Sequence, residues 1–165
     1  MIDKALKWSF EPDQQSILKL WKAAQVIPAG RILFSRLIGR LAPYTGTIRD
    51  DVVHLQAGHA RCEMREHKRI HNHLNSVHAV ALVNLMEKTT GLAMLTATPP
   101  GMRGIVTHLE IDYVRKARGV LMATSHAPSV VAQTSQTYFV PAEIKDASGE
   151  IVCTGLAHWL ISPTT

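Results

Sequence analysis

Residues 79–86 are almost all Ala, Val, Leu or Met, and this short stretch constrains the fold more than any other part of the chain. A helix made of these residues is apolar nearly all round, so it must be buried rather than lie on a surface. Ser76 can cap such a helix at its start, and Gly91 can end it. The sequence therefore predicts one buried helix at the centre of the fold.

Segments on both sides of this helix have the alternating pattern of β-strands. Before the helix, residues 48–56 and 59–68 form a predicted strand pair joined at Gly58. After it we expect a short strand at residues 92–98, a turn at residues 99–101 and four more strands. Those four strands cover residues 105–114, 120–127, 134–144 and 151–161. The expected fold class is α+β, with a mostly antiparallel sheet wrapped around a single long helix.

Two amphipathic helices, at residues 13–24 and 32–41, are predicted before the sheet, and Asp13 can cap the first of them. The chain of 165 residues is most simply one domain. Within that domain we expect residues 1–45 to form a helical extension and residues 46–163 to form the core.

The composition fits an ordinary globular protein, with 46% hydrophobic and 19% charged residues. The formal charge of +5 favours anionic partners in general. We expect no nucleic acid, because no long basic run occurs and few aromatic residues stand among the Lys and Arg residues. The sequence has no signal-peptide pattern and no apolar run long enough to cross a bilayer, so we expect a cytoplasmic protein. Cys62 and Cys153 lie in strand-like patterns and are expected to be buried free thiols.

The order of these elements resembles the hotdog fold of acyl-CoA thioesterases over about residues 46–163. His78 and Glu87, nine residues later, resemble the His-Gly-Gly start and helical carboxylate of the phenylacetate-degradation-type thioesterases. Asn72 matches an Asn of that motif, and Asn75 is the alternative match. The resemblance implies an acyl-thioester hydrolase that uses no separate cofactor, since coenzyme A enters as part of the substrate.

Two further segments carry the resemblance. Residues 112–119 resemble the family's strand-then-turn segment, and residues 146–149 resemble its last hairpin. Residues 72–91, together with the N-terminal helices, look closer still to an uncharacterised bacterial branch classed as a domain of unknown function. Ala79 and Val80 depart from the pattern because the motif has two glycines there, and Glu87 replaces the more usual Asp.

Thioester hydrolysis needs a group that activates water or attacks the carbonyl, and donors that stabilise the oxyanion. The first N–H groups of a helix have no partner within it, so the Ala79 N–H is the candidate oxyanion donor. The resemblance implies that Glu87 is the base or nucleophile, and that His78 orients the substrate or the helix entrance. Asn72 or Asn75 would then hold the attacking water or the carboxylate.

Ala79 and Glu87 are eight residues apart, which separates them by about 12 Å along one helix. One chain therefore cannot bring both to the same carbonyl. A second copy of the helix is needed, so we expect a homodimer or a dimer of dimers with the active site at the interface. Related hotdog enzymes, by the resemblance, place their sites in this way.

A basic turn contains Arg115, Lys116 and Arg118, where the family often meets the nucleotide end of coenzyme A. Guanidinium and ammonium groups would attract a phosphate there, and the carrier is either coenzyme A or an acyl-carrier protein. The alternative interpretation is a solvated, charged turn.

The sequence also allows other hypotheses. Glu87 could be a structural carboxylate paired with Lys88 or Lys145. The protein could bind acyl thioesters without catalysis, which the loss of the two motif glycines favours, or it could be a hotdog hydratase or dehydratase. No metal site is expected, because the spacing of the histidines at 67, 71, 73 and 78 matches neither a helical zinc motif nor a Cys/His finger.

Overall fold

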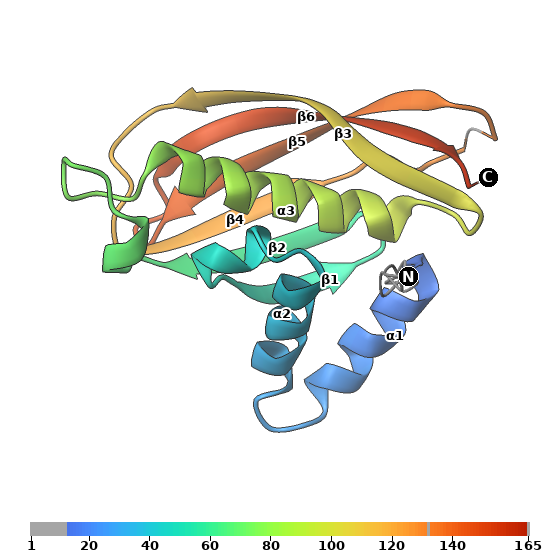
Figure 1. Ribbon diagram of the computed structural model, residues 1–165, viewed down its shortest axis with the longest axis horizontal. Helices are drawn as coiled ribbons and strands as arrows, with labels where there is room; N and C mark the ends of the chain where they lie inside the picture. The colour runs from blue at the N-terminus through green and yellow to red at the C-terminus, as the bar shows by residue number, and fades with distance from the viewer. Residues whose placement is uncertain (1–12, 132, 165) are drawn as a thin grey trace, which may run out of the picture.

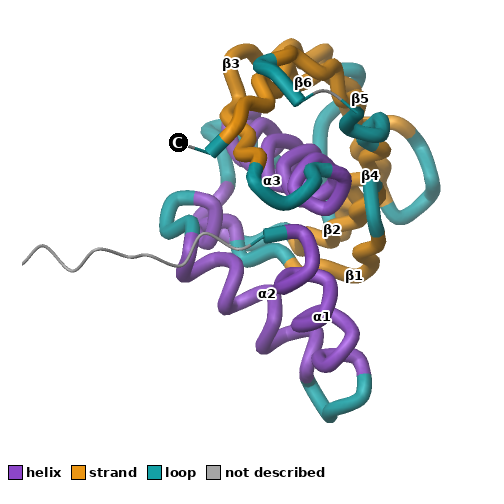
Figure 2. Tube along the Cα trace, turned by 90° about the vertical axis from the view of Figure 1, so that its right-hand side faces the viewer, coloured by secondary structure: helices purple, strands orange, loops and turns teal. Residues whose placement is uncertain are grey.

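One long helix lies against a curved six-stranded sheet in the computed structural model, which describes residues 13–131 and 133–164 (Figure 1). In chain order the elements are α1 (Gln14–Gln25), α2 (Gly30–Leu41), the 3₁₀ turn η1 (Thr45–Ile48), β1 (Asp51–Gln56), β2 (His59–Arg65), the 3₁₀ turn η2 (Lys68–Ile70), α3 (Ala79–Ala97), β3 (Met102–Tyr113), β4 (Val120–His126), β5 (Gln136–Asp146) and β6 (Ile151–Pro163). The view along α3 shows the sheet curling around it (Figure 2). This confirms the predicted α+β class with one central helix.

All strand pairs in the sheet are antiparallel, and the strand order is β1-β2-β4-β5-β6-β3. The two ends of the order, β1 and β3, are therefore edge strands. β3 has twelve residues and pairs along its length with β6, so its other edge has no partner among the described residues. A long edge strand of this kind presents unpaired backbone groups to any neighbouring molecule.

The limits of α3 differ from those predicted. His78, rather than Ser76, is the N-cap residue, and the helix continues through Gly91 to Ala97. Residues 92–97 are thus the last turns of α3, with Thr98 as the C-cap, instead of a strand. A short apolar run does not distinguish a strand from a buried helix, and Leu, Ala and Met favour the helix. Gly91 is needed for packing, because a Cβ there would lie 3.1 Å from the ring of Trp159.

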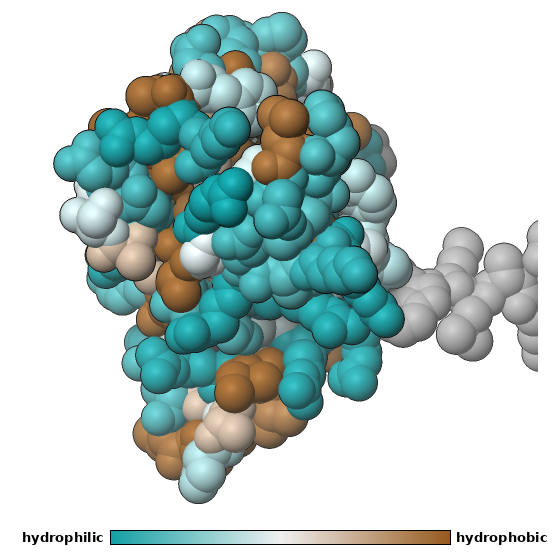
Figure 3. Space-filling view, turned by 90° about the vertical axis from the view of Figure 1, so that its left-hand side faces the viewer, coloured by the Kyte–Doolittle hydropathy of each residue, from teal (hydrophilic) through white to brown (hydrophobic). Residues whose placement is uncertain are grey.

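α1 and α2 form a hairpin that projects from the sheet (Figure 1), close to the predicted positions. Asp13 caps α1 by accepting a 2.7 Å hydrogen bond from the Ser16 N–H, as predicted. The two helices meet through an edge-on contact between Trp21 and Phe34, whose ring centroids are 5.1 Å apart. The tip of the hairpin is hydrophobic (Figure 3). Its most exposed apolar residues are Val26, Ile27, Ile32 and Leu33.

Cys62 and Cys153 are both buried free thiols, which confirms the prediction. Burial raises the pKa of Cys62 to about 12 and that of Cys153 to about 11. Neither thiol is therefore ionised near neutral pH, so neither is a reactive nucleophile. No helix in the described part of the chain is long and apolar enough to cross a membrane.

Candidate active site

The first turn of α3 is held by its own cap. The Nδ1 atom of His78 accepts a hydrogen bond from the Val80 N–H at 3.1 Å, which fixes the imidazole at the helix entrance. The Ala79 N–H donates to no residue in the described part of the chain. His78 and Ala79 are both exposed. This end of α3 therefore keeps one free backbone donor, strengthened by the positive end of the helix dipole.

The loop before α3 is organised by Asn72. Its Oδ1 atom accepts hydrogen bonds from the Leu74 N–H at 2.9 Å and from the Ser76 N–H and hydroxyl at 3.2 Å each. The Asn72 oxygen is thus used to shape the loop, and only its NH₂ group is free to meet a ligand. Asn75 is exposed at a φ of 55°, a left-handed conformation that Asn tolerates better than most residues.

The basic turn lies beside the start of α3. The Val77 N–H donates to the Ala117 carbonyl at 3.0 Å, and the Tyr113 hydroxyl donates to the Ala79 carbonyl at 3.3 Å. Within the turn, Arg115 forms an exposed salt bridge with Glu150 at 3.0 Å. Lys116 and Arg118 are exposed and form no salt bridge with described residues. The structure thus gathers these predicted residues at one end of α3: Asn72, Asn75, His78, Ala79, Arg115, Lys116 and Arg118.

Glu87 lies two helical turns further along α3 and is half-buried. Burial raises the pKa of its carboxyl above the ordinary value of 4.5. No described residue forms an ion pair or a side-chain hydrogen bond with this carboxylate. Both partners considered for a structural role are occupied elsewhere, because Lys88 pairs with Asp50 at 2.8 Å and Lys145 pairs with Glu143 at 2.6 Å.

The neighbours of Glu87 along the helix show which way its side chain faces. Thr90 faces β6, where its hydroxyl accepts a hydrogen bond from the Trp159 indole at 3.3 Å. Asn84 faces η1 and donates to the Tyr44 carbonyl at 3.2 Å. Helical periodicity puts Glu87 between these two directions, on the side of α3 that the sheet leaves uncovered. The Glu87 carboxylate therefore faces a region that a substrate or a second chain can reach.

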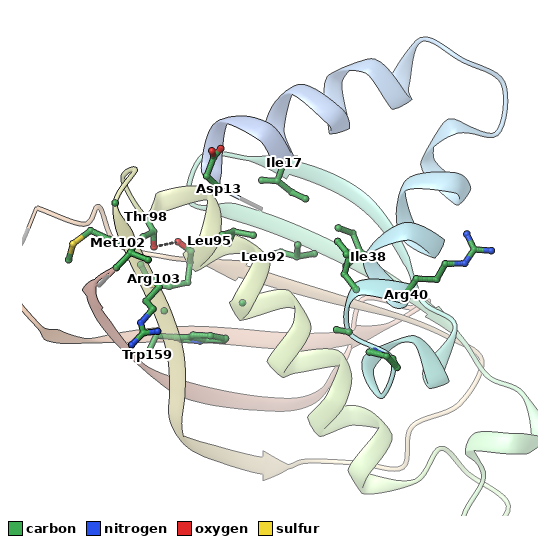
Figure 4. Close-up of a pocket in the computed structure, with 18 residues that line it drawn as sticks. Asp13, Ile17, Ile38, Arg40, Leu92, Leu95, Thr98, Met102, Arg103 and Trp159 are labelled. Carbon is green, nitrogen blue, oxygen red and sulfur yellow. Dashed lines mark hydrogen bonds between the residues drawn. The ribbon is translucent and has the colours of Figure 1, made fainter. Parts of the chain in front are cut away.

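An apolar cavity of about 850 Å³ lies on the same side of α3, between the α1–α2 hairpin and the start of β3 (Figure 4). Its lining includes Ile17, Ile38, Leu92, Leu95, Met102 and Trp159. Gly91 also lines it and is one helical turn beyond Glu87, so the cavity begins close to the carboxylate. Sequence reasoning missed this cavity because its walls come from five separate elements, and no local pattern marks it.

A family model described as a domain of unknown function (DUF4442) matches residues 30–161 of this chain. The chain belongs to the DUF4442 family. The match includes α2 as well as the sheet and α3, so the second helix of the hairpin is part of the family's common structure. A comparison with curated proteins found no match for this DUF4442 protein.

Solved structures similar to this DUF4442 chain share the hotdog fold. A structural-genomics protein, APC5556, is 27% identical with a TM-score of 0.77, over 90% of this chain and 98% of that chain. A phenylacetic acid degradation-related protein from Ralstonia eutropha is 16% identical with a TM-score of 0.63, over 72% and 89%. A hypothetical thioesterase from Streptococcus pneumoniae, solved with coenzyme A, is 18% identical with a TM-score of 0.60, over 70% and 87%. These likenesses confirm the predicted hotdog thioesterase resemblance at the level of the fold.

Proposed function

We propose that this protein hydrolyses acyl thioesters, with Glu87 as the base or nucleophile. The observation that carries the proposal is the state of Glu87: a half-buried carboxylate with no described partner and a raised pKa, one helical turn before Gly91 of the apolar cavity. A structural carboxylate in such a position is normally paired, because burial of an unpaired charge is costly. Carboxylates held in this way are typical of catalytic sites.

The parts of the proposed reaction are distributed along α3. The acyl chain would lie in the apolar cavity beyond Gly91, with the thioester carbonyl near Glu87. Glu87 would remove a proton from the attacking water, and collapse of the tetrahedral intermediate would break the C–S bond and release the thiol with the proton that Glu87 took up. If Glu87 attacks the carbonyl itself, the C–S bond breaks to leave an acyl–Glu87 anhydride, which water then hydrolyses. The free N–H of Ala79 would donate to the oxyanion that forms, while His78 holds the helix entrance in place.

The proposed site requires two chains, since the Ala79 N–H and the Glu87 carboxylate are about 12 Å apart along one helix. The free edge of β3 supports a two-fold dimer in which each chain adds its β3 to the other's sheet. Antiparallel pairing of two β3 strands would bring the uncovered sides of the two α3 helices together. Each of the two sites would then combine the donor of one chain with the carboxylate of the other.

The proposed substrate is an acyl-CoA or an acyl-carrier thioester. Lys116 and Arg118 support an anionic carrier at the Ala79 end of α3, because both are exposed and free of described ion pairs. Arg115 contributes less, since it is paired with Glu150. That the Streptococcus pneumoniae protein was solved with coenzyme A adds support from a chain of the same fold.

The test is the release of free thiol from short, medium and long acyl-CoAs by the wild type and by Glu87→Gln. We expect turnover by the wild type and a loss of about 10²–10⁴-fold in the variant, the usual contribution of a general base. Glu143→Gln is the matched control, because Glu143 is paired with Lys145 away from the site and should keep the wild-type rate. A folded, dimeric Glu87→Gln protein with an undiminished rate would remove Glu87 from the mechanism.

A second candidate function is the binding of acyl thioesters without hydrolysis. Val80 favours it, because this side chain is 48% exposed at the helix entrance, where the thioesterase motif has a glycine. An isopropyl group at this point narrows the approach to the Ala79 N–H. Tight binding of an acyl-CoA with no thiol release across the whole panel would select this function.

A further inference from the structure

A second cavity, of about 1070 Å³, lies on the other side of the α2–η1 connection. We call it the arginine pocket, after the four arginines that line it. These are Arg36 and Arg40 of α2, Arg49 directly after η1, and Arg69 of η2. All four are exposed, and none forms an ion pair with a carboxylate in the described part of the chain.

The charge of the pocket is not compensated by its own acids. Lys88, Asp50 and Asp51 are the other charged residues of the lining. The Lys88 ammonium lies 2.8 Å from both carboxylate oxygens of Asp50, and the two side chains are 3% and 1% exposed. Lys88 and Asp50 thus neutralise each other, and Asp51 remains against four guanidinium groups. The lining therefore has a net charge of +3.

The local backbone explains the placement of three of the four arginines. Arg36 and Arg40 are four residues apart and so lie on one side of α2. Arg49 has a φ of 55°, a left-handed conformation that turns the chain so that Asp50 enters the core while Arg49 stays outside.

A close contact between glycines adds rigidity to the same corner. A Cβ on Gly46 would lie 2.6 Å from the carbonyl oxygen of Gly39, so the backbones of α2 and η1 touch without intervening side chains. Arg36, Arg40 and Arg49 thus stand on, or directly after, backbone elements packed against each other. Such a frame positions side chains more precisely than a free loop does.

We propose that the arginine pocket is a binding site for the phosphoryl groups of an anionic ligand. Guanidinium groups bind phosphate oxygens through paired hydrogen bonds, and unpaired arginines around one concave site favour a multiply charged anion. The volume exceeds what one phosphate fills and is slightly above the upper end of the range for small-molecule and cofactor sites, about 1,000 Å³. The ligand class is therefore a diphosphate or a phosphorylated nucleotide.

The position of the pocket connects it with the candidate active site. Arg40 and Pro43 line both the arginine pocket and the apolar cavity, and Lys88 follows Glu87 in α3. A ligand with a phosphorylated head and an apolar tail would match the two cavities together. Binding of phosphoryl groups stands on the pocket alone; only the assignment of these groups to the coenzyme A part of a substrate rests on the proposed function.

The experiment is calorimetric titration of the full chain with inorganic pyrophosphate, adenosine 3′,5′-bisphosphate, coenzyme A and pantetheine. We expect pyrophosphate and the bisphosphate to bind, with an affinity that falls as salt is raised. Arg36→Gln/Arg40→Gln should weaken both by about tenfold or more, which corresponds to about 1.4 kcal/mol. The matched control is Lys22→Gln/Arg31→Gln, which removes two exposed cations from the hairpin and should leave binding unchanged. Arg69→Gln, outside α2, should weaken binding in a variant that leaves this helix intact.

Two outcomes identify the source of the phosphoryl groups. If coenzyme A binds more tightly than pantetheine and loses this advantage in Arg36→Gln/Arg40→Gln, the ligand is the carrier of the substrate, and its phosphates lie in the arginine pocket instead of at Lys116 and Arg118. If pyrophosphate binds but coenzyme A gains nothing over pantetheine, the pocket serves a free phosphorylated ligand.

The inference is overturned if pyrophosphate and the bisphosphate do not bind, or if both arginine variants bind them as the wild type does. A protein that binds pyrophosphate but releases no thiol would refute the proposed function alone, so the two failures are distinguishable.

Discussion

Glu87 and Lys88 are neighbours in α3, but only the charge of Lys88 has a described partner. Lys88 is fully buried and paired at 2.8 Å with Asp50, whereas Glu87 is half-buried and has no described partner. A paired buried charge becomes costly only when its partner is removed. An unpaired one is costly in the native protein itself. Replacement of Glu87 should therefore raise the free energy of unfolding, whereas replacement of Lys88 should lower it.

Glu87→Gln should raise the free energy of unfolding at about pH 8 and leave it unchanged well below the ordinary pKa of 4.5. Burial raises the pKa in the folded state, so at low pH the carboxyl is neutral in both states and costs nothing. As the pH rises through the raised pKa, the cost of a buried carboxylate appears and the wild type loses stability relative to the variant. Urea unfolding at the two pH values measures this difference. A variant less stable than the wild type at about pH 8 would instead indicate a structural carboxylate.

Breaking the buried pair should destabilise the protein strongly. Asp50→Asn or Lys88→Met alone leaves one uncompensated charge and should cost about 3–5 kcal/mol of unfolding free energy. The double variant Asp50→Leu/Lys88→Met removes both charges and should recover most of that loss. Urea denaturation of the three variants measures the pair, and single variants that lose less than about 1 kcal/mol would show that the pair is not isolated from water.

At the scale of elements, the contact of α2 with η1 depends on two glycines. Gly46→Ala should destabilise the protein by about 1–3 kcal/mol, because the new Cβ would lie 2.6 Å from a backbone oxygen that cannot move alone. Gly104→Ala is the matched control. There the nearest atom, at 2.9 Å, is the end of the Ile161 side chain, which can rotate away. Thermal unfolding should show a larger decrease for Gly46→Ala, and equal decreases would contradict a rigid contact.

Most elements could be predicted from the sequence because their patterns are local. Asp13 before an apolar stripe predicted α1, and alternation over residues 105–114 predicted β3. The predicted end of α3 at Gly91 was wrong. A glycine indicates the end of a helix only where no tertiary contact requires a glycine at that position. Here Trp159, distant in the sequence, lies against Gly91 and the helix continues. The predicted N-cap of α3 was also wrong, because the Nδ1 atom of His78, instead of the hydroxyl of Ser76, accepts the hydrogen bond from the first turn of the helix.

The candidate site could be predicted less completely. The sequence indicated Glu87 and the polar residues before α3, which lie in one continuous segment. It did not show that Lys88 and Lys145 have other partners, because Asp50 is thirty-eight residues from Lys88 in the chain. Nor did it show either cavity, since each is lined by segments that only the fold brings together.

At the scale of the whole molecule, the free edge of β3 predicts self-association. The wild type should sediment or scatter as a dimer or larger even-numbered assembly. Ile105, which is 62% exposed on β3, is a suitable probe, because lysine on an edge strand opposes pairing. Ile105→Lys should shift the protein toward the monomer and reduce thiol release with it. Val26→Lys, on the hairpin tip and 83% exposed, is the control that should stay dimeric. An active monomer would contradict a shared site.

Arg40 and Pro43 line both cavities, so a ligand in either cavity contacts residues that also border the other. Any free energy transmitted through these residues is reciprocal: if an apolar chain changes the affinity for an anion by some factor, the anion changes the affinity for the chain by the same factor. Through the short connection after α2, two chemically unlike ligands, or two halves of one ligand, would thus change each other's binding affinity.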